Sequence, residues 1–243
     1  MKISRKIKLL ILLLMCSSIF FIYNKTNNNN INYTSLGDGL AKGIDCYGQI
    51  DYGYSDYVKE YLQEKNKLKV YSKDYTGQDM TIERLTNTIL TNKKVNHNNK
   101  KTNIKTILRE TDYLTISIGM NDLLYRLDNS AKLNNDTLNK VIKEIEESFN
   151  ELITEIKKVY QKEIYVIGYY QTKKENDYLN KAINKLNDIY MKNENITYIS
   201  TKTISKNKEQ FLPNPNSYYP NYKGYQVIST KIINKISKKL EKS

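Results

Sequence analysis

The chain has 243 residues, which suits one domain preceded by a targeting segment, and its hydrophobic residues, 39% of the total, can form one sizeable core. The net charge is +13, but the basic residues are scattered among Asn, Ile and Tyr along the whole chain. No clustered arginine helix or RNA-binding signature accompanies this charge. We therefore expect a solvated basic surface and no nucleic-acid partner.

The positions of the cysteines and the lack of metal-binding or cofactor-binding motifs argue against a disulfide-rich protein and against a metal- or cofactor-dependent one. Cys16 lies in an apolar N-terminal run and Cys46 in the domain that follows, so we expect no disulfide framework. Met15 stands where a lipoprotein signal needs a small residue, which argues against lipidation of Cys16. The sequence contains no zinc-ligand cluster, phosphate loop or dinucleotide fingerprint, so we expect no metal and no cofactor.

Residues 1–23 have the layout of a signal peptide or a signal anchor, with basic residues before an apolar run at 9–23. No small-x-small cleavage motif follows Ser18, so we favour an uncleaved anchor that holds the chain in the cell membrane as a single-pass protein. The basic flank should stay cytoplasmic, which puts the rest outside; cleavage would make the protein secreted. Residues 24–31 are predicted to be a flexible linker and 32–243 the folded domain.

Short β-type runs alternate with longer helical patterns through the domain. Strands are predicted at 32–36, 68–72, 113–118, 164–168 and 196–200. Helices are predicted at 54–64, 81–90, 142–156, 178–191 and about 222–240, and the polar residues 92–103 are predicted to be a loop. This alternation indicates an α/β fold, a three-layer α/β/α sandwich with a doubly wound, five-stranded parallel sheet. Ligands of such sheets bind at the carboxyl ends of the strands.

Four informative segments stand at those strand ends. Residues 35–43, with Gly-Asp-Gly, follow the first strand; residues 75–78, with Thr-Gly-Gln, follow the second; residues 116–123, with Gly-Met-Asn-Asp, follow the third. Residues 212–225 precede the last helix. In this order the segments resemble the four blocks of the SGNH, or GDSL, hydrolase family of lipases, esterases and acylhydrolases. The Gly-Tyr-Tyr at 168–170 looks like the bacterial extracellular branch.

The resemblance implies an ester-hydrolase fold whose catalytic triad is degenerate in this chain. The first block of the family carries a nucleophilic serine, and Gly39 stands at that position. The last block carries an acid and a histidine. The acid position falls at Asn216 or Ser217, and the histidine position holds Tyr219. Residues 220–225 match the remainder of the block.

The same resemblance implies that an oxyanion hole persists as a ligand pocket. Gly77 and Asn121 match the family residues that supply a backbone N–H and a side-chain amide, and Gly39 keeps its N–H. Converging donors of this kind suit a carbonyl, carboxylate or phosphate oxygen. Asp38 and Asp122 are expected to support the site structurally.

Hydrolysis by this route needs an oxygen nucleophile and a base with a pKa near neutrality. Gly39 has no side chain, and a phenol such as Tyr219 has a pKa of about 10, which makes it a poor base. Tyr219 either donates its hydroxyl into the pocket or fills the former cleft. Among substitutes, His97 lies in the predicted loop and Ser35 within a strand, so Asp38 is the strongest one.

The sequence therefore predicts a catalytically inactive, membrane-tethered SGNH-like protein outside the cell. Acyl groups, acetylated sugars and anionic wall polymers are candidate ligands, and a protein is a candidate partner. The alternative is an active ester hydrolase, an acylhydrolase or deacetylase on lipid or wall polysaccharide, with an atypical site. A scaffold without a small-molecule ligand is a third hypothesis.

Overall fold

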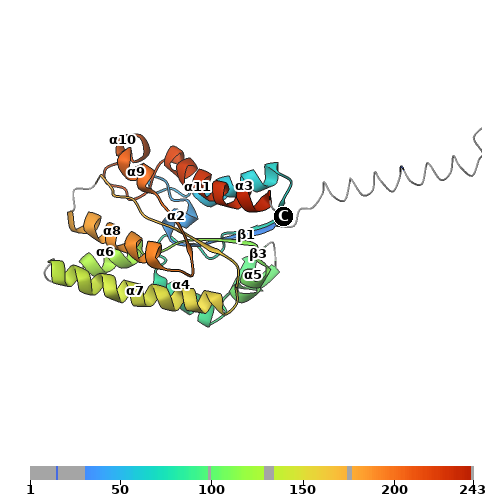
Figure 1. Cartoon of the computed structure of the whole chain (residues 1–243), viewed down its shortest axis with the longest axis horizontal. Coiled ribbons are helices and arrows are strands. Elements are labelled where there is room, and N and C mark those ends of the chain that lie inside the picture. The colour runs from blue at the N-terminus through green and yellow to red at the C-terminus, as the bar shows by residue number, and fades with distance from the viewer. Residues whose placement is uncertain (1–14, 16–30, 98–99, 129–133, 174–176, 242–243) are drawn as a thin grey trace, which may run out of the picture.

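The computed structural model describes residue 15 and residues 31–97, 100–128, 134–173 and 177–241 (Figure 1). The predicted anchor and linker lie outside these residues, except for Met15 and for Ile31, which begins the first strand. Within the described ranges, no helix combines the length and apolar character needed to span a bilayer.

A five-stranded parallel sheet forms the centre of the domain, as the sequence predicts, with strand order β2-β1-β5-β6-β7. Every strand overlaps its predicted range. The bounds are β1 (Ile31–Gly37), β2 (Leu68–Ser72), β5 (Tyr113–Ser117), β6 (Ile164–Ile167) and β7 (Thr197–Ile199).

Helices cover both faces of the sheet and complete the three layers (Figure 1). One face carries α3 (Tyr54–Glu64) and α11 (Tyr222–Leu240), which pack on each other. The opposite face carries α4 (Ile82–Leu90), α5 (Ile104–Glu110), α6 (Met120–Asp128), α7 (Asn135–Lys157) and α8 (Asp177–Lys192). The short helices α2 (Gly39–Lys42), α9 (Lys202–Lys206) and α10 (Lys208–Phe211) lie in the connections.

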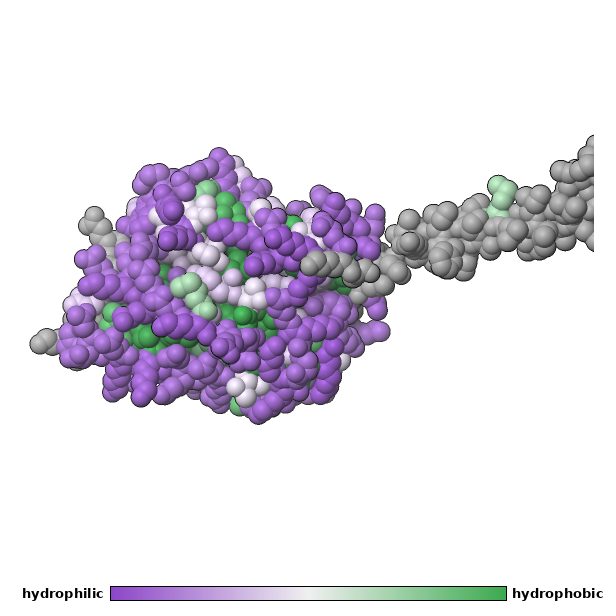
Figure 2. All heavy atoms as spheres, in the orientation of Figure 1, coloured by the Kyte–Doolittle hydropathy of each residue, from purple (hydrophilic) through white to green (hydrophobic). Residues whose placement is uncertain are grey.

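The core follows from the periodicity of the apolar residues. All four residues of β6 are buried, as expected for a strand covered on both faces. Helix α7 buries one stripe, which includes Ile145, Phe149 and Ile156, and the Phe149 ring centroid lies 4.6 Å from that of Tyr190 on α8. Figure 2 shows that hydrophilic residues cover most of one outer face, which fits the expected solvated surface.

The predicted loop at 92–103 is wrong, because most of it forms an antiparallel hairpin. Strand β3 (Lys94–His97) pairs with β4 (Lys100–Asn103). The Tyr75 hydroxyl donates to the carbonyl oxygens of Lys93 and Thr102, at 2.6 and 3.2 Å, and so attaches the hairpin to the segment after β2. These polar strands are held by a contact distant in sequence, which local hydrophobic pattern does not reveal.

The order of the strands places a switch point between β1 and β5, because the chain leaves β1 in one direction for β2 and later returns to its other side. Gly37 ends β1 opposite Ser117, which ends β5. Gly37 has φ +123°, and an added Cβ would lie 1.8 Å from the Ser117 carbonyl oxygen, so only glycine fits. The segments carrying Asp38 and Asn121 therefore leave the sheet side by side.

Candidate active site

Asp38 fixes the turn between β1 and α2. Its Oδ1 accepts a hydrogen bond from the Leu40 N–H at 3.1 Å and another from the Ser117 hydroxyl at 2.9 Å. The Tyr169 hydroxyl donates to Oδ2. The residue is 2% exposed, so these protein donors replace water around the carboxylate. The arrangement suits the supporting role that the resemblance implies.

Burial raises the pKa of Asp38 from 3.8 to about 6, although the hydrogen bonds from Tyr169, Ser117 and Leu40 oppose the rise. The carboxyl is protonated in both the folded and unfolded chain below about pH 4. As the pH rises through about 6, the folded chain must ionise a buried group that ionised earlier in the unfolded chain, so this contribution to stability is lost.

The Asp38→Asn variant is therefore expected to change the pH dependence of stability. Between about pH 4 and 7 the wild type should lose about 2–3 kcal/mol more unfolding free energy than the variant. The measurement is urea unfolding of both chains at several pH values. Hydrogen bonds lost in the variant add an offset that does not change with pH. A difference between the two chains that consists of this offset alone, with no dependence on pH, would refute the raised pKa.

Gly39 and Tyr219, which the resemblance assigns to the nucleophile and histidine positions of the family, meet in the structure. An ideal Cβ on Gly39 would lie 2.1 Å from the Tyr219 hydroxyl oxygen, 2.6 Å from Cζ and 2.8 Å from Cε1. Atoms of two residues do not approach so closely in folded proteins. The Tyr219 phenol therefore fills the space that a serine side chain would need, as the sequence hypothesis of a filled cleft expects.

The remaining triad positions form a local turn. The Ser217 hydroxyl accepts from the Tyr219 N–H at 3.1 Å, and the Asn214 side-chain oxygen accepts from the Asn216 N–H at 3.0 Å. Asn216 is exposed, so its side chain is not sequestered beside Tyr219. These residues shape the loop that delivers Tyr219, and neither Asn216 nor Ser217 supplies a carboxylate.

Two tyrosines hold this loop in place. The Tyr170 hydroxyl donates to the Tyr218 carbonyl oxygen at 3.0 Å, and the Tyr225 hydroxyl donates to the Ile44 carbonyl oxygen at 2.5 Å. Asn221 then begins α11 as its N-cap by accepting from the Gly224 N–H at 3.1 Å. The position of Tyr219 is thus set by contacts to several parts of the fold.

Two of the predicted oxyanion-hole donors, the Gly77 N–H and the Asn121 amide, already donate hydrogen bonds to carbonyl oxygens of the protein. The Gly77 N–H donates to the Gly37 carbonyl oxygen at 2.9 Å. The Asn121 amide nitrogen donates to the carbonyl oxygens of Gln78 and Met80, each at 2.8 Å. These three bonds tie the segment after β2 to the switch point. Binding of a ligand by these donors stays a prediction. It requires that the donors first break their hydrogen bonds to the protein.

The cavity at this place is small. It has a volume of about 20 Å³, room for about one water molecule. Its lining comprises Asp38, Leu40, Met120, Asn121, Leu124, Tyr169, Tyr170, Tyr218 and Tyr219. The structure therefore brings together Asp38, Asn121 and Tyr219, with Gly39 against the Tyr219 ring, but leaves no open cleft among them.

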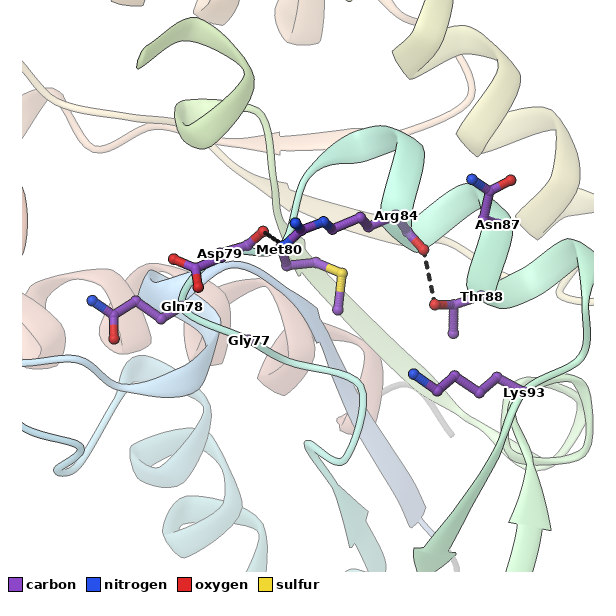
Figure 3. A pocket seen from close by; sticks show the side chains of 8 residues that line it. All are labelled: Gly77, Gln78, Asp79, Met80, Arg84, Asn87, Thr88 and Lys93. Carbon is purple, nitrogen blue, oxygen red and sulfur yellow. Dashed lines mark hydrogen bonds between the residues drawn. The ribbon is translucent and has the colours of Figure 1, made fainter. Parts of the chain in front are cut away.

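Gly77 lines a separate cavity of about 430 Å³ that shares no residue with the small one (Figure 3). Its lining comprises Gly77, Gln78, Asp79, Met80, Arg84, Asn87, Thr88 and Lys93. The Arg84 guanidinium donates to the Asp79 carbonyl oxygen at 2.9 Å. Figure 3 shows Arg84 directed toward this carbonyl and the Lys93 side chain approaching from the hairpin side.

Asp122 stabilises the start of α4. Its two carboxylate oxygens lie 3.2 and 3.1 Å from the Ile82 nitrogen, which donates to them, and the residue is buried. Burial raises the pKa of Asp122 to about 6. The contact joins α6 to α4, which again suits a supporting role.

The other residues considered as substitutes lie elsewhere. The Ser35 hydroxyl is buried in β1, 3.2 Å from the hydroxyl of Tyr54. His97 lies on β3, with Nδ1 2.6 Å from a carboxylate oxygen of Asp74, and lines a cavity that shares no residue with the one beside Tyr219. Neither side chain reaches the position of the missing nucleophile.

Sequence reasoning gave no role to Ser117, Tyr169 or Tyr170. Ser117 and Tyr169 bind Asp38, and Tyr170 fixes the loop that carries Tyr219. All of them stand within motifs that the resemblance had already highlighted. Their position at the ends of β5 and β6 is the signal that could have identified them.

The fold and the convergence of the four sequence segments at its switch point define a three-layer α/β protein of the hydrolase type. The family model of the GDSL-like Lipase/Acylhydrolase matches residues 27–232, and the chain belongs to this family.

Solved structures of the same fold include a lipase, Lip_vut3, from a goat rumen metagenome, with a TM-score of 0.66 and 16% identity over 83% of this chain and 95% of that one. Axe2, an acetylxylan esterase from Geobacillus stearothermophilus, gives a TM-score of 0.59 and 16% identity over 87% of this chain and 96% of that one. At this identity the likeness establishes the fold. Among curated proteins, no significant match is found.

Proposed function

We propose that this chain is a catalytically inactive member of the family that is retained to bind a ligand or a protein partner. The observation that carries the proposal is the contact between Gly39 and Tyr219. No side chain projects from position 39, and the tyrosine takes the space that a nucleophile would need. A nucleophile and a base near neutral pKa are both required for acyl transfer by this route.

The groups beside Gly39 do not replace the triad. Burial, with a smaller contribution from the Asp38 charge, raises the pKa of Tyr219 above its ordinary value, so the phenol stays protonated and cannot act as the base. Asp38 accepts hydrogen bonds from Leu40, Ser117 and Tyr169, which occupy three of the roughly four lone-pair sites of its carboxylate. This chemistry favours binding over hydrolysis.

The candidate ligands are acyl groups, acetylated sugars and anionic wall polymers. The names of the similar structures, a lipase and an acetylxylan esterase, fit acyl and acetylated-sugar ligands. The net charge of +13 favours an anionic ligand. The proposal includes a protein partner as a further candidate, since a domain with a closed site keeps its outer surface available.

The proposal places the domain outside the cell, held by the apolar run at 9–23 with its basic flank inside. An epitope added after residue 243 should be cleaved by protease applied to intact cells, and the protein should stay in the membrane fraction. An epitope protected until the membrane is dissolved would refute this orientation.

The test of inactivity is an ester assay on the full chain purified in detergent. We expect no release of p-nitrophenol or acetate from simple esters above a buffer blank, for the wild type and for Asp38→Ala alike. Turnover by the wild type that disappears in Asp38→Ala would overturn the proposal and support the alternative, an ester hydrolase with an atypical site.

A further inference from the structure

A second, larger cavity lies beside the closed site. It has a volume of about 590 Å³ and is bounded by the segments after β6 and β7 and by helices α8 and α9; we call it the β6–β7 cavity. Tyr169 lines both this cavity and the small one at Tyr219, so the two are neighbours. The carboxyl ends of parallel strands are the usual place for a ligand in such a sheet.

One wall of the β6–β7 cavity is an aromatic ring seated on the backbone. An ideal Cβ on Gly168 would lie 2.5 Å from the Cε2 and hydroxyl oxygen of Tyr198 and 2.8 Å from the side-chain oxygen of Asn187. The absence of a side chain at Gly168 therefore lets Tyr198 and Asn187 lie against the strand end. The ring is consequently held in a defined place at the edge strand β7.

The Asn187 amide is fixed as well. Its oxygen accepts from the Tyr169 N–H at 2.9 Å and its nitrogen donates to the Tyr169 carbonyl oxygen at 2.7 Å. This pair of bonds joins α8 to the end of β6. These bonds fix the position of Asn187, one of the residues that line the cavity.

Uncharged polar groups supply most of the remaining lining. They come from Gln171, Asn184, Asn187, Ser200 and Ser205. Amides and hydroxyls both donate and accept hydrogen bonds, which suits a ligand whose hydroxyl groups do the same. Met191, 57% exposed, adds an apolar edge. Hydrogen-bonding groups beside a tyrosine ring suit a sugar, which has polar edges and apolar C–H faces.

Charge at the β6–β7 cavity favours one kind of sugar. Lys202 and Lys206 line it and are exposed, and Asp188 is the only acidic residue among its lining. Neither lysine forms an ion pair with any residue that the structure describes. Two cations against one carboxylate give a net positive site, which attracts a carboxylate or phosphate.

From these observations we infer that the β6–β7 cavity binds an anionic saccharide, with the sugar ring on Tyr198 and the acidic group toward Lys202 and Lys206. The inference rests on the proposed binding function and moves its site away from the closed pocket at Tyr219. The expected ligand is a saccharide that bears carboxylate or phosphate groups.

The test uses the full chain in a detergent without a sugar headgroup, and titration calorimetry with tetragalacturonate, cellotetraose and chitotetraose. The wild type should bind tetragalacturonate most tightly. Tyr198→Leu should weaken this binding about tenfold, which is about 1.4 kcal/mol. Because this substitution could disturb β7, the exposed Asn184→Ala is the second variant, and it should weaken binding in the same direction.

The charge variants separate the acidic group from the sugar ring. Lys202→Gln with Lys206→Gln should remove the preference for tetragalacturonate over the neutral sugars. Lys93→Gln, an exposed lysine at the other cavity, is the matched control and should bind as the wild type does.

The inference is overturned by wild-type binding of none of the three sugars, by binding indifferent to both Tyr198→Leu and Asn184→Ala, or by an equal loss in Lys93→Gln. Ester turnover by the wild type would refute the proposed inactivity alone, because sugar binding is measured independently of it.

Discussion

A chain carrying Gly39→Ser, Ser217→Asp and Tyr219→His is expected to hydrolyse p-nitrophenyl acetate, whereas the wild type is not. The physical reason is that positions 39 and 219 already meet, since the Tyr219 ring atoms Cζ and Cε1 lie 2.6 and 2.8 Å from a Cβ built on Gly39. A histidine ring is shorter than a phenol and leaves room for the serine hydroxyl. Initial rates of p-nitrophenol release measure the gain.

The restored rate should be modest, because the Asn121 amide is engaged by Gln78 and Met80. Loss of one oxyanion-hole donor costs about 10²–10³ in rate in an acyl-transfer enzyme with a serine nucleophile. A parallel chain with Asn216→Asp in place of Ser217→Asp tests the other acid position. The chain with Ser217→Asp and Tyr219→His but an intact Gly39 is the control, and equal activity in it would contradict a nucleophile position at residue 39.

The Gly39→Ala substitution is expected to destabilise the wild-type chain by about 1–3 kcal/mol, the usual cost of forcing an extra group into a filled space. The added methyl group would lie 2.1 Å from the Tyr219 hydroxyl oxygen, so the ring or the loop before α11 must move. In a Tyr219→Ala background the same change should cost much less. Urea unfolding of the four chains gives the coupling free energy.

Gly77→Ala is the matched control for this cycle. A Cβ on Gly77 would meet Met80 alone, at 3.8 Å or more, which is ordinary contact, and Gly77 lies in the same region of the fold. Its effect should be small and independent of Tyr219. Additive effects of Gly39→Ala and Tyr219→Ala would show that the tyrosine does not fill the space beside Gly39.

The parts of the fold that the sequence predicts are those with strong periodicity. The helix predicted at 142–156 extends over Asn135–Lys157 in the structure, because Asn134 accepts from the Thr137 N–H and starts it earlier. The hairpin β3–β4 could not be predicted, since its polar strands depend on Tyr75. Local pattern encodes burial on one face but not a bond to a distant hydroxyl.

In the candidate site, too, the sequence predicts some contacts and not others. The motif order predicts that Gly39 and Tyr219 converge, because both stand at the carboxyl edge of the sheet, and the structure brings them into contact. The engagement of Asn121 with Gln78 and Met80 depends on the path of the segment after β2, which no motif specifies. The β6–β7 cavity likewise depends on the placement of α8 and α9 around the ends of β6 and β7, which no motif specifies.

Ester turnover by the Tyr219→Ala chain is the most direct test of the proposed inactivity. It distinguishes a site that lacks catalytic groups from a competent site that the Tyr219 ring only blocks. Removing the ring opens the space beside Gly39 without adding a nucleophile or a base. The account predicts that p-nitrophenyl acetate incubated with this variant breaks down no faster than in buffer. Saturable turnover by the opened chain would contradict it, because a competent catalytic group would then stand behind the tyrosine.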